Sequence, residues 1–241
     1  MKRTLVLTSI LFSFIFSFGQ GYSIIDFDSN NVKLSQTDRL IVSIFSDVWQ
    51  NIPANVNAKS INVGASTTIY KDMPIKLSKF SFAFGLGITS HNFHSDAMPS
   101  LNSTGDTLSL TNIPDTVNGS LITYSKNKFS LSYLDLPIEF RFRSKSPGNK
   151  KMKYSLGFKI GYLINRKIKY KGRDLNGEDK DVKYKTHNIQ FVENFRYGVT
   201  ARIGWSWIAI NAYYSLTPIF IKDKGPDMFP ISVGISLSPF N

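Results

Sequence analysis

Residues 80–89 read Phe80-Ser81-Phe82-Ala83-Phe84-Gly85-Leu86-Gly87-Ile88-Thr89. Every second side chain is large and apolar, and the side chains between them are small or polar. Strict alternation is typical of a β-strand, because successive side chains point to opposite faces. The small face could not build a soluble core, whereas the bulky face suits contact with lipid. The segment therefore predicts a transmembrane β-strand.

The same alternation recurs along the chain and predicts eight strands. We place them at residues 39–52, 58–72, 78–93, 128–144, 151–166, 192–205, 206–217 and 229–240. The first is the least regular, since Ile41 and Phe45 fall on its polar face. Backbone groups find no water in lipid, so a membrane sheet must close on itself. The sequence predicts an all-β fold: an eight-stranded antiparallel up-and-down transmembrane β-barrel.

The predicted connections agree with this topology. The second, fourth and sixth are short, whereas residues 94–127 and 167–191 form long connections. Outer-membrane barrels have short turns on the periplasmic side and long loops outside. We therefore expect both termini in the periplasm and both long segments outside. Residues 94–127 are rich in Ser, Thr and Asn, so we expect that loop to be mobile.

Aromatic residues are expected to form a girdle at each membrane interface. Near the periplasmic strand ends the predicted strands place Tyr70, Phe80, Phe142, Tyr154, Trp205, Trp207 and Phe240. Toward the outer ends they place Tyr162, Phe195, Tyr197 and Tyr214. A soluble β-sandwich or lipocalin-like barrel is the alternative, but glycines and arginines that share a face make a poor soluble exterior.

The N-terminal residues predict export. Lys2 and Arg3 precede an apolar run that ends at Phe18, and Ser17-Phe18-Gly19 supply small residues before Gln20. This is the pattern of a cleavable signal peptide, which we place at 1–19. The run is shorter than the roughly 20 residues of a membrane-spanning helix. Residues 20–37 then form a short periplasmic arm and 38–241 the barrel domain.

The net charge of +12 does not indicate nucleic-acid binding, because no basic helix or aromatic RNA-binding stretch is present. The chain contains no cysteine, so disulfides and a lipid-modified N-terminal cysteine are excluded. Basic exported loops instead favour an anionic partner, namely outer-membrane lipid and lipopolysaccharide. We predict contacts with lipopolysaccharide phosphates for Lys167, Lys169, Lys171 and Arg173.

An eight-stranded barrel has a narrow interior that its own side chains fill. Alternation predicts a charge network in this lumen, made of Asp135, Glu139, Arg141, Arg143, Lys159, Arg196 and Arg202. Asp47 is a further candidate. Buried charges must be paired, so a ladder of salt bridges is expected here and a diffusion pore is not. Pro137 lacks an N–H donor, and a bulge is expected there.

The strand that carries most of these charges resembles a known family. It reads Ser132-Tyr133-Leu134-Asp135-Leu136-Pro137-Ile138-Glu139-Phe140-Arg141-Phe142 and is similar to the Y-(L/I)-(D/E)-(I/L)-P strand of PorT-like outer-membrane barrels (porin family, outer membrane protein beta-barrel domain). GFKIGYLI at 157–164 and FRYGVTARIGW at 195–205 extend the resemblance. It implies a Gram-negative outer membrane and a relation to type IX secretion, although residues 21–37 lack the FGF-x-LG segment of the secretion member.

No catalytic, cofactor or metal residue is expected. His91, His94 and Asp96 could ligate a metal, but no fourth ligand is evident and the spacing favours solvated loop residues. His91 with Ser90 or Ser95 is the only pair that could begin a hydrolytic site, and no motif of an activated nucleophile accompanies it.

Two tripeptides of the first long loop resemble a modification sequence of the same bacterial group. Asp106-Thr107-Leu108 and Asp115-Thr116-Val117 match the pattern Asp-(Ser/Thr)-apolar, which predicts O-glycosylation at Thr107 and Thr116.

The sequence thus leads to one main hypothesis and two alternatives. We expect a non-enzymatic outer-membrane barrel that is an accessory or structural component of the envelope or of a secretion or assembly complex, with other envelope proteins as partners. One alternative is a small ligand- or ion-binding barrel that uses its polar lumen. The other is an outer-membrane enzyme that modifies lipid A or phospholipid.

Overall fold

The computed structural model describes residues 39–75, 78–144, 152–176, 178, 180–187 and 189–239. The chain divides into two compact units, Met1–Ser35 and Gln36–Asn241, and all described residues belong to the second. The predicted signal peptide and periplasmic arm lie outside the described residues, as does Phe240. No described segment is a helix long and apolar enough to cross a membrane.

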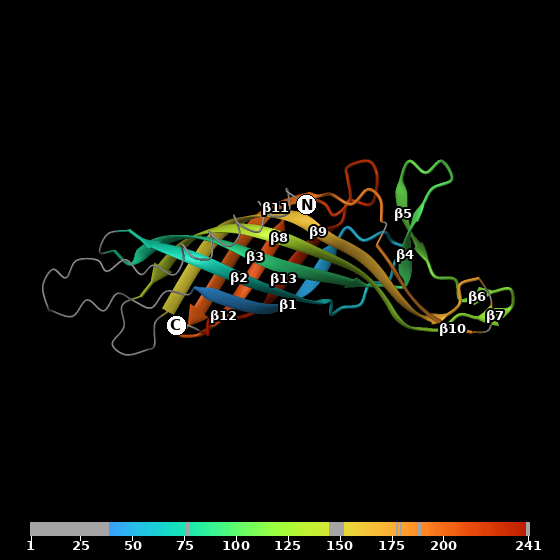
Figure 1. The fold of residues 1–241 in the computed structure, drawn as a ribbon, viewed down its shortest axis with the longest axis horizontal. Helices are drawn as coiled ribbons and strands as arrows, with labels where there is room; N and C mark the ends of the chain where they lie inside the picture. The colour runs from blue at the N-terminus through green and yellow to red at the C-terminus, as the bar shows by residue number, and fades with distance from the viewer. Residues whose placement is uncertain are drawn as a thin grey trace, which may run out of the picture. The chain divides into compact units, whose positions relative to one another are not determined.

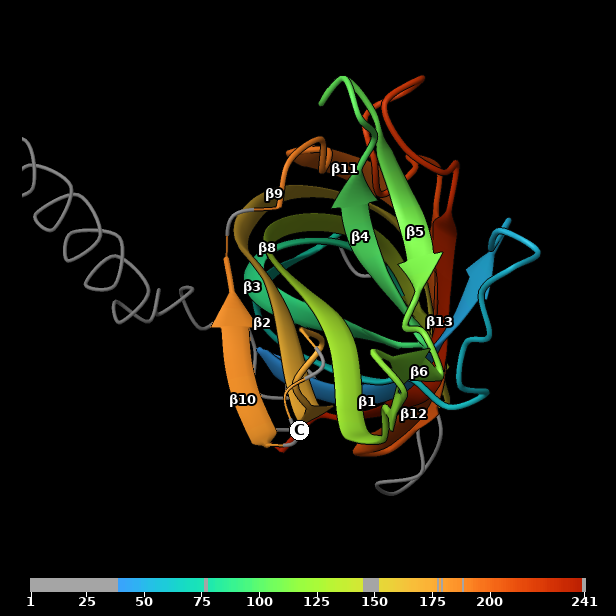
Figure 2. The ribbon, with the colours of Figure 1, turned by 90° about the vertical axis from the view of Figure 1, so that its right-hand side faces the viewer.

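Eight strands form a closed antiparallel ring. They are β1 (Leu40–Gln50), β2 (Val63–Pro74), β3 (Phe80–His94), β8 (Tyr124–Arg143), β9 (Met152–Arg173), β11 (Phe195–Trp205), β12 (Ile208–Ser215) and β13 (Phe229–Leu237). Their order is β9-β11-β12-β13-β1-β2-β3-β8, and β8 pairs again with β9 (Figures 1 and 2). The first and last strands meet, with Val42 opposite Leu237. The predicted eight-stranded antiparallel barrel is confirmed.

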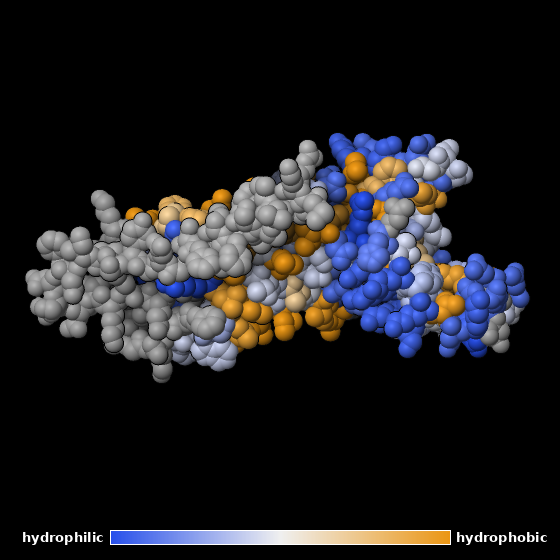
Figure 3. All heavy atoms as spheres, viewed as in Figure 1, coloured by the Kyte–Doolittle hydropathy of each residue, from blue (hydrophilic) through white to orange (hydrophobic). Residues whose placement is uncertain are grey.

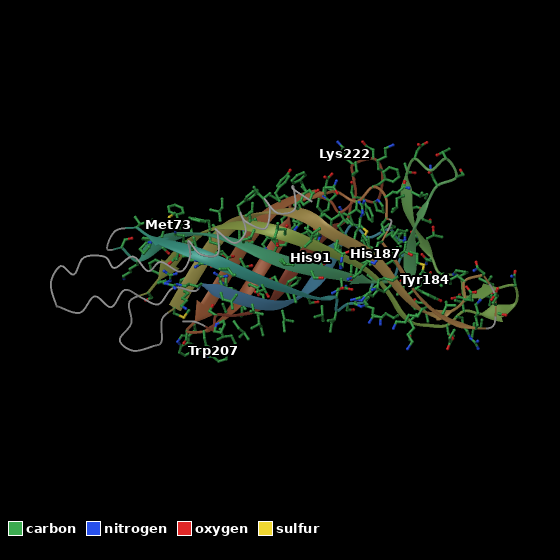
Figure 4. The ribbon with its side chains drawn as sticks, viewed as in Figure 1. Met73, His91, Tyr184, His187, Trp207 and Lys222 are labelled. Carbon is green, nitrogen blue, oxygen red and sulfur yellow. The ribbon has the colours of Figure 1, made fainter. Side chains whose placement is uncertain are left out.

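The two ends of the barrel differ in their connections. At one end the connections are residues 75–79, 144–151 and 206–207, and we call it the short-turn end. At the other, the long-loop end, they are residues 51–62, 95–123, 174–194 and 216–228. Met73 and Trp207 mark the short-turn end in Figure 4, and Tyr184 lies toward the long-loop end.

All eight barrel strands carry exposed large apolar side chains, which form a band around the barrel. Figure 3 shows part of this band on one face. On β3 the outward residues Phe80, Phe82, Phe84, Leu86 and Ile88 are 41%, 48%, 42%, 45% and 53% exposed, whereas their neighbours Ser81, Ala83, Gly87 and Thr89 are buried. Such an exterior would be unstable in water, because the apolar area it exposes far exceeds an ordinary surface patch. We call this region the hydrophobic band.

Aromatic rings are found toward both edges of the band. Phe142 and Tyr154 have ring centroids 6.0 Å apart near the short-turn end, and Tyr162 and Phe195 are 5.1 Å apart toward the long-loop end. The prediction that Tyr70 belongs to an aromatic girdle is wrong. Its side chain is buried, and its hydroxyl reaches into the lumen. Alternation along β2 places the neighbouring residue, Ile69, outside instead, where it is 56% exposed.

Beyond the band, β8 and β9 extend further than predicted and reach Tyr124 and Arg173. The segment expected to be a mobile polar loop contains four short strands. These are β4 (Ala97–Leu101), β5 (Leu108–Asn112), β6 (Thr116–Val117) and β7 (Ser120–Leu121), paired as β4–β5 and β6–β7. A further strand, β10 (Asp181–Thr186), pairs with the extension of β9. The alternating Leu108-Ser109-Leu110, whose two leucines are buried, was the local signal for β5.

The bulge predicted at Pro137 is not found. Pro137 pairs with Lys159 in unbroken register, and the β3–β8 ladder only lacks the pairs of Gly85 and Leu86 beside it. The register of β8 against β9 shifts elsewhere, between Tyr124 and Lys126 and between Ser132 and Tyr133. A missing N–H therefore interrupts one ladder without adding a residue to a strand.

Gly161 illustrates how the lumen is packed. A Cβ at this position would lie 2.8 Å from Nε and 2.9 Å from Cγ of Arg196, and would also contact Asp135. Glycine therefore leaves the space that a buried ion pair occupies.

Gly161→Val should lower the free energy of unfolding by about 1–3 kcal/mol, because the new side chain overpacks the lumen. Denaturant unfolding of the folded protein in detergent, followed by tryptophan fluorescence, measures this change. Ala201→Val is the control, since Ala201 on the adjacent β11 is exposed on the exterior and should tolerate the same side chain. Equal stability of both variants would contradict the described packing.

Candidate functional site

Within the described residues, buried charged side chains gather mainly in the polar lumen. Four carboxylates, Asp47, Asp72, Asp135 and Glu139, lie with five cationic side chains, Arg141, Arg143, Lys159, Arg196 and Arg202. All seven residues of the predicted charge network are therefore brought together here. These seven residues occupy alternate positions on β8, β9 and β11 that face the lumen, because residues two apart on a strand share a face.

The first cluster forms around Asp135, which is 1% exposed. Nη2 of Arg196 donates to both carboxylate oxygens at 2.9 Å, and Oγ1 of Thr89 donates to Oδ2. Lys159 Nζ lies 3.7 Å from Oδ2. The guanidinium carbon of Arg196 lies 3.9 Å from the centre of the Tyr133 ring. The carboxylate thus satisfies two cations, and an aromatic face packs against one of them.

His91 joins this cluster to Asp47. Its Nδ1 lies 2.9 Å and 3.0 Å from the two oxygens of Asp47, which also accepts a hydrogen bond of 2.6 Å from Ser232 Oγ. Nη1 of Arg196 contacts Nε2 of His91. Arginine can only donate, so Nε2 is the acceptor and Nδ1–H faces Asp47. Neutral His91 thereby links the Asp47 carboxylate to Arg196, which is itself paired with Asp135.

The second cluster forms around Glu139, which is 3% exposed. Its Oε1 accepts from the Tyr70 hydroxyl at 2.7 Å, and its Oε2 accepts from Arg141 Nε and Arg202 Nη2 at 2.8 Å each. The Arg141 guanidinium carbon lies 4.3 Å from the Tyr70 ring centre. This one carboxylate therefore links three strands, β2, β8 and β11, across the barrel.

Asp72 completes the network at the short-turn end. Arg143 Nη1 lies 2.6 Å from Oδ2, Arg141 Nη1 lies 3.6 Å from Oδ1, and Ser81 Oγ donates to Oδ1 at 3.0 Å. Asp72 shares the parity of Tyr70 on β2, so continued alternation past residue 70 was the sequence signal for both.

A small cavity lies beside the first cluster. The cavity between Trp49, His91, Tyr133 and Arg196 measures about 10 Å³, which is close to the space of a single water molecule. Toward the short-turn end, Ile41 and Ala83 pack inside the barrel with Tyr70. Ile41, which made the first strand look irregular, is therefore a lumen residue.

An apolar cluster, which we call the outer cluster, fills the long-loop end. Its buried members include Trp49, Phe93, Phe129, Leu131 and Ile168 from barrel strands. Every long connection adds a buried residue to it: Val56, Ala97, Ile189 and Phe220. Trp49 and Phe93 have ring centroids 5.1 Å apart, and Phe129 stacks on Phe220 at 6.0 Å. The outer cluster closes this end of the lumen with apolar packing.

The expectation that His91 is a solvated loop residue is wrong, since it is 2% exposed and faces the lumen. Asp96 accepts hydrogen bonds from Asn57 N and Nδ2 at 2.8 and 2.7 Å. Within the described residues no group of three metal-ligand side chains is close enough to hold an ion.

The remaining candidates lie beyond the hydrophobic band. Lys167, Lys169 and Lys171 are on the exterior face of the β9 extension, and Arg173 Nε lies 4.0 Å from Asp181 Oδ1 at its end. Thr107 directly precedes β5, and Thr116 is exposed in the β6–β7 hairpin.

Glu139→Gln should lower the free energy of unfolding by roughly 3 kcal/mol, because Arg141 and Arg202 lose the buried carboxylate charge that they share. Glu178→Gln is the control, since that carboxylate is 61% exposed and should change stability by less than about 0.5 kcal/mol.

The same denaturant titration also measures coupling. Glu139→Gln with Arg202→Gln should cost less than the sum of the single variants, because the two side chains pair directly. Additive losses would mean that the ion pair does not stabilise the barrel.

Comparison with known proteins supports the architecture. A family model described as "Outer membrane protein beta-barrel domain" matches residues 16–220. No curated protein and no solved structure matches the chain. The family match spans most of the chain and agrees with the closed ring and its apolar exterior. The protein is therefore an outer-membrane β-barrel and belongs to the outer membrane protein beta-barrel domain family.

Proposed function

We propose that the protein is a non-conducting, non-enzymatic barrel that acts as an accessory or structural component of an envelope complex. The resemblance of residues 132–142 to PorT-like barrels suggests a secretion or assembly complex. The observation that carries the proposal is the filled lumen, with ion pairs along the membrane segment and the outer cluster at the long-loop end.

The filled lumen opposes transport for an energetic reason. An ion that entered would have to displace arginines from carboxylates that are already fully paired, and each broken buried pair costs several kcal/mol. It would then have to cross the apolar outer cluster, where no polar group replaces its hydration. The small cavity beside His91 argues against the ligand-binding alternative, since it has room for about one water molecule.

The environment of His91 argues against the lipid-modifying enzyme. A hydrolytic site needs a base whose free imidazole nitrogen faces a nucleophile. Here Nε2 faces Arg196, and Ser232 donates to Asp47 rather than to the imidazole. Ser90, the neighbour considered as a nucleophile, lies on the opposite face of β3 from His91.

The long-loop end supports a role in binding other proteins. All four long connections pack onto one core, and β8 and β9 continue well beyond the hydrophobic band (Figure 1). Long loops of outer-membrane barrels face outside, so this folded end would be presented at the cell surface. A barrel that only anchored itself would need no such structure.

Planar lipid bilayers test the closed lumen. Wild-type protein should insert without a steady current, because neither water nor ions have a continuous path. A porin in the same bilayer serves as positive control, and resistance of the inserted protein to protease verifies folding. A steady wild-type current that Arg141→Gln alters would contradict the proposal and favour the ion-binding alternative.

A mild-detergent purification of the natively expressed, tagged protein tests the role in a complex. Native mass spectrometry should reveal a stoichiometric envelope protein, absent from a parallel purification of an unrelated tagged barrel. Recovery of the barrel alone, under conditions that keep a known envelope complex intact, would overturn the accessory role.

A further inference from the structure

Seven lysines form a regular array on the exterior beyond the hydrophobic band. They are Lys126, Lys128, Lys167, Lys169, Lys171, Lys183 and Lys185, contributed by β8, β9 and β10. The register places six of them directly opposite one another in two rows, and Lys167 lies opposite Ser130. One row is Lys128–Lys169–Lys185, and the next is Lys126–Lys171–Lys183. We call this array the lysine lattice.

The lattice continues the lipid-facing surface of the barrel. On β8, Lys126 and Lys128 share their face with Leu134, Leu136 and Ile138, which belong to the hydrophobic band. On β9 the last apolar residue of the band is Ile164, which is 50% exposed. Lys167 follows three residues later, roughly 10 Å along the strand. It shares the face of Ile164 because the β8–β9 register shifts here, which leaves Ile164 without a partner on β8. Hydrophilic surface borders the band in this region (Figure 3).

The opposite face of the same sheet is aromatic. The ring centroids of Tyr170 and Tyr184 lie 5.1 Å apart, and those of Tyr124 and Tyr170 lie 6.1 Å apart. Tyr170 is 1% exposed. This tyrosine packing fixes which way the three strands face, so all seven lysines point to the exterior.

The lattice is unfavourable for the isolated protein. Like charges directly opposite on neighbouring strands destabilise a sheet. Within the part of the chain that the structure describes, none of the seven lysines forms an ion pair with a carboxylate. Lys128 Nζ donates to the neutral amide oxygen of Asn92 at 2.7 Å. Outside the hydrophobic band, the charge of Lys167 lowers the pKa of Lys169.

We propose that the lysine lattice binds the phosphate groups of lipid A in the outer leaflet. Ammonium groups act as point charges for phosphate, and the rows present them on adjacent strands about 5 Å apart. Several ammonium groups can therefore surround one phosphate, and their position just above the acyl-chain level matches the lipid headgroup. Arg173, a predicted contact, is excluded from the lattice because it faces Asp181.

This inference depends on the outer-membrane location and not on the accessory role, so either can fail without the other. It extends the predicted contacts from β9 to a surface of three strands. The partner is the phosphorylated glycolipid itself, recognised by charge at the rim of the band.

Titration with lipid A tests the inference on the full-length protein, folded in a neutral detergent. Bisphosphorylated lipid A and the same lipid without phosphates are added separately, and native mass spectrometry counts bound lipid. The variant Lys128→Gln/Lys169→Gln/Lys171→Gln should bind the bisphosphorylated lipid about a hundredfold more weakly than wild type, since each surface lysine contributes about a fivefold factor. Wild type should bind the dephosphorylated lipid as weakly as the lattice variant binds bisphosphorylated lipid A.

The matched control is Lys71→Gln/Lys79→Gln/Lys222→Gln, which removes the same charge at exposed positions outside the lattice. It should bind like wild type. Without lipid A, the lattice variant should unfold at a denaturant concentration no lower than wild type, because like-charge contacts are removed. If the triple variant does not fold, the single variants Lys128→Gln and Lys169→Gln replace it, each with about fivefold weaker binding.

Two results would overturn the lattice as a phosphate site. The first is equal binding of bisphosphorylated lipid A by wild type and the lattice variant. The second is equal binding of phosphorylated and dephosphorylated lipid by wild type, which would assign the contact to acyl chains on the hydrophobic band.

Discussion

Backbone hydrogen bonding in a medium without water is the constraint on which the rest of this structure depends. A sheet in lipid can leave no edge unpaired, so β1 must meet β13 and β8 must meet β9. Closure at eight strands makes the interior narrow enough for side chains to fill. Bulky apolar residues are then forced outside and glycines and charges inside. The lumen chemistry is therefore a consequence of the closed ring.

The charges inside the ring must be balanced where water cannot balance them. Asp135 and Glu139 each receive two cations, and Tyr70 and Tyr133 place their rings beside arginine guanidinium groups. The ion pairs join strands that are far apart in the sequence, so they specify the register as well as the charge balance. The same ion pairs occupy the interior of the barrel, whereas the lysine lattice lies on its exterior surface.

The environment of the strands reverses at the edge of the hydrophobic band that is nearer the long-loop end. Below it, β8 has charges inside and apolar side chains outside, whereas above it Phe129 and Leu131 lie inside and Lys126 and Lys128 outside. The solvent outside changes from lipid to water, and the inside changes accordingly from ion pairs to an apolar core. On β8 the sequence alternates without a break across this edge, whereas on β9 the outward parity shifts by one residue after Ile164. The outer cluster and the lysine lattice both arise from this reversal.

The sequence by itself determined the closed barrel and which side of each strand faces lipid, because residues two apart on one strand decide that property. It also identified all seven charges of the lumen network from their parity. Only the tertiary structure decided their partners: Tyr70 and Asp72 from β2, and His91, which joins Arg196 to Asp47. These contacts depend on the register between strands that long loops separate, which local alternation does not specify. The fold of residues 95–123 and the lysine rows of β8, β9 and β10 depend on the same long-range pairing.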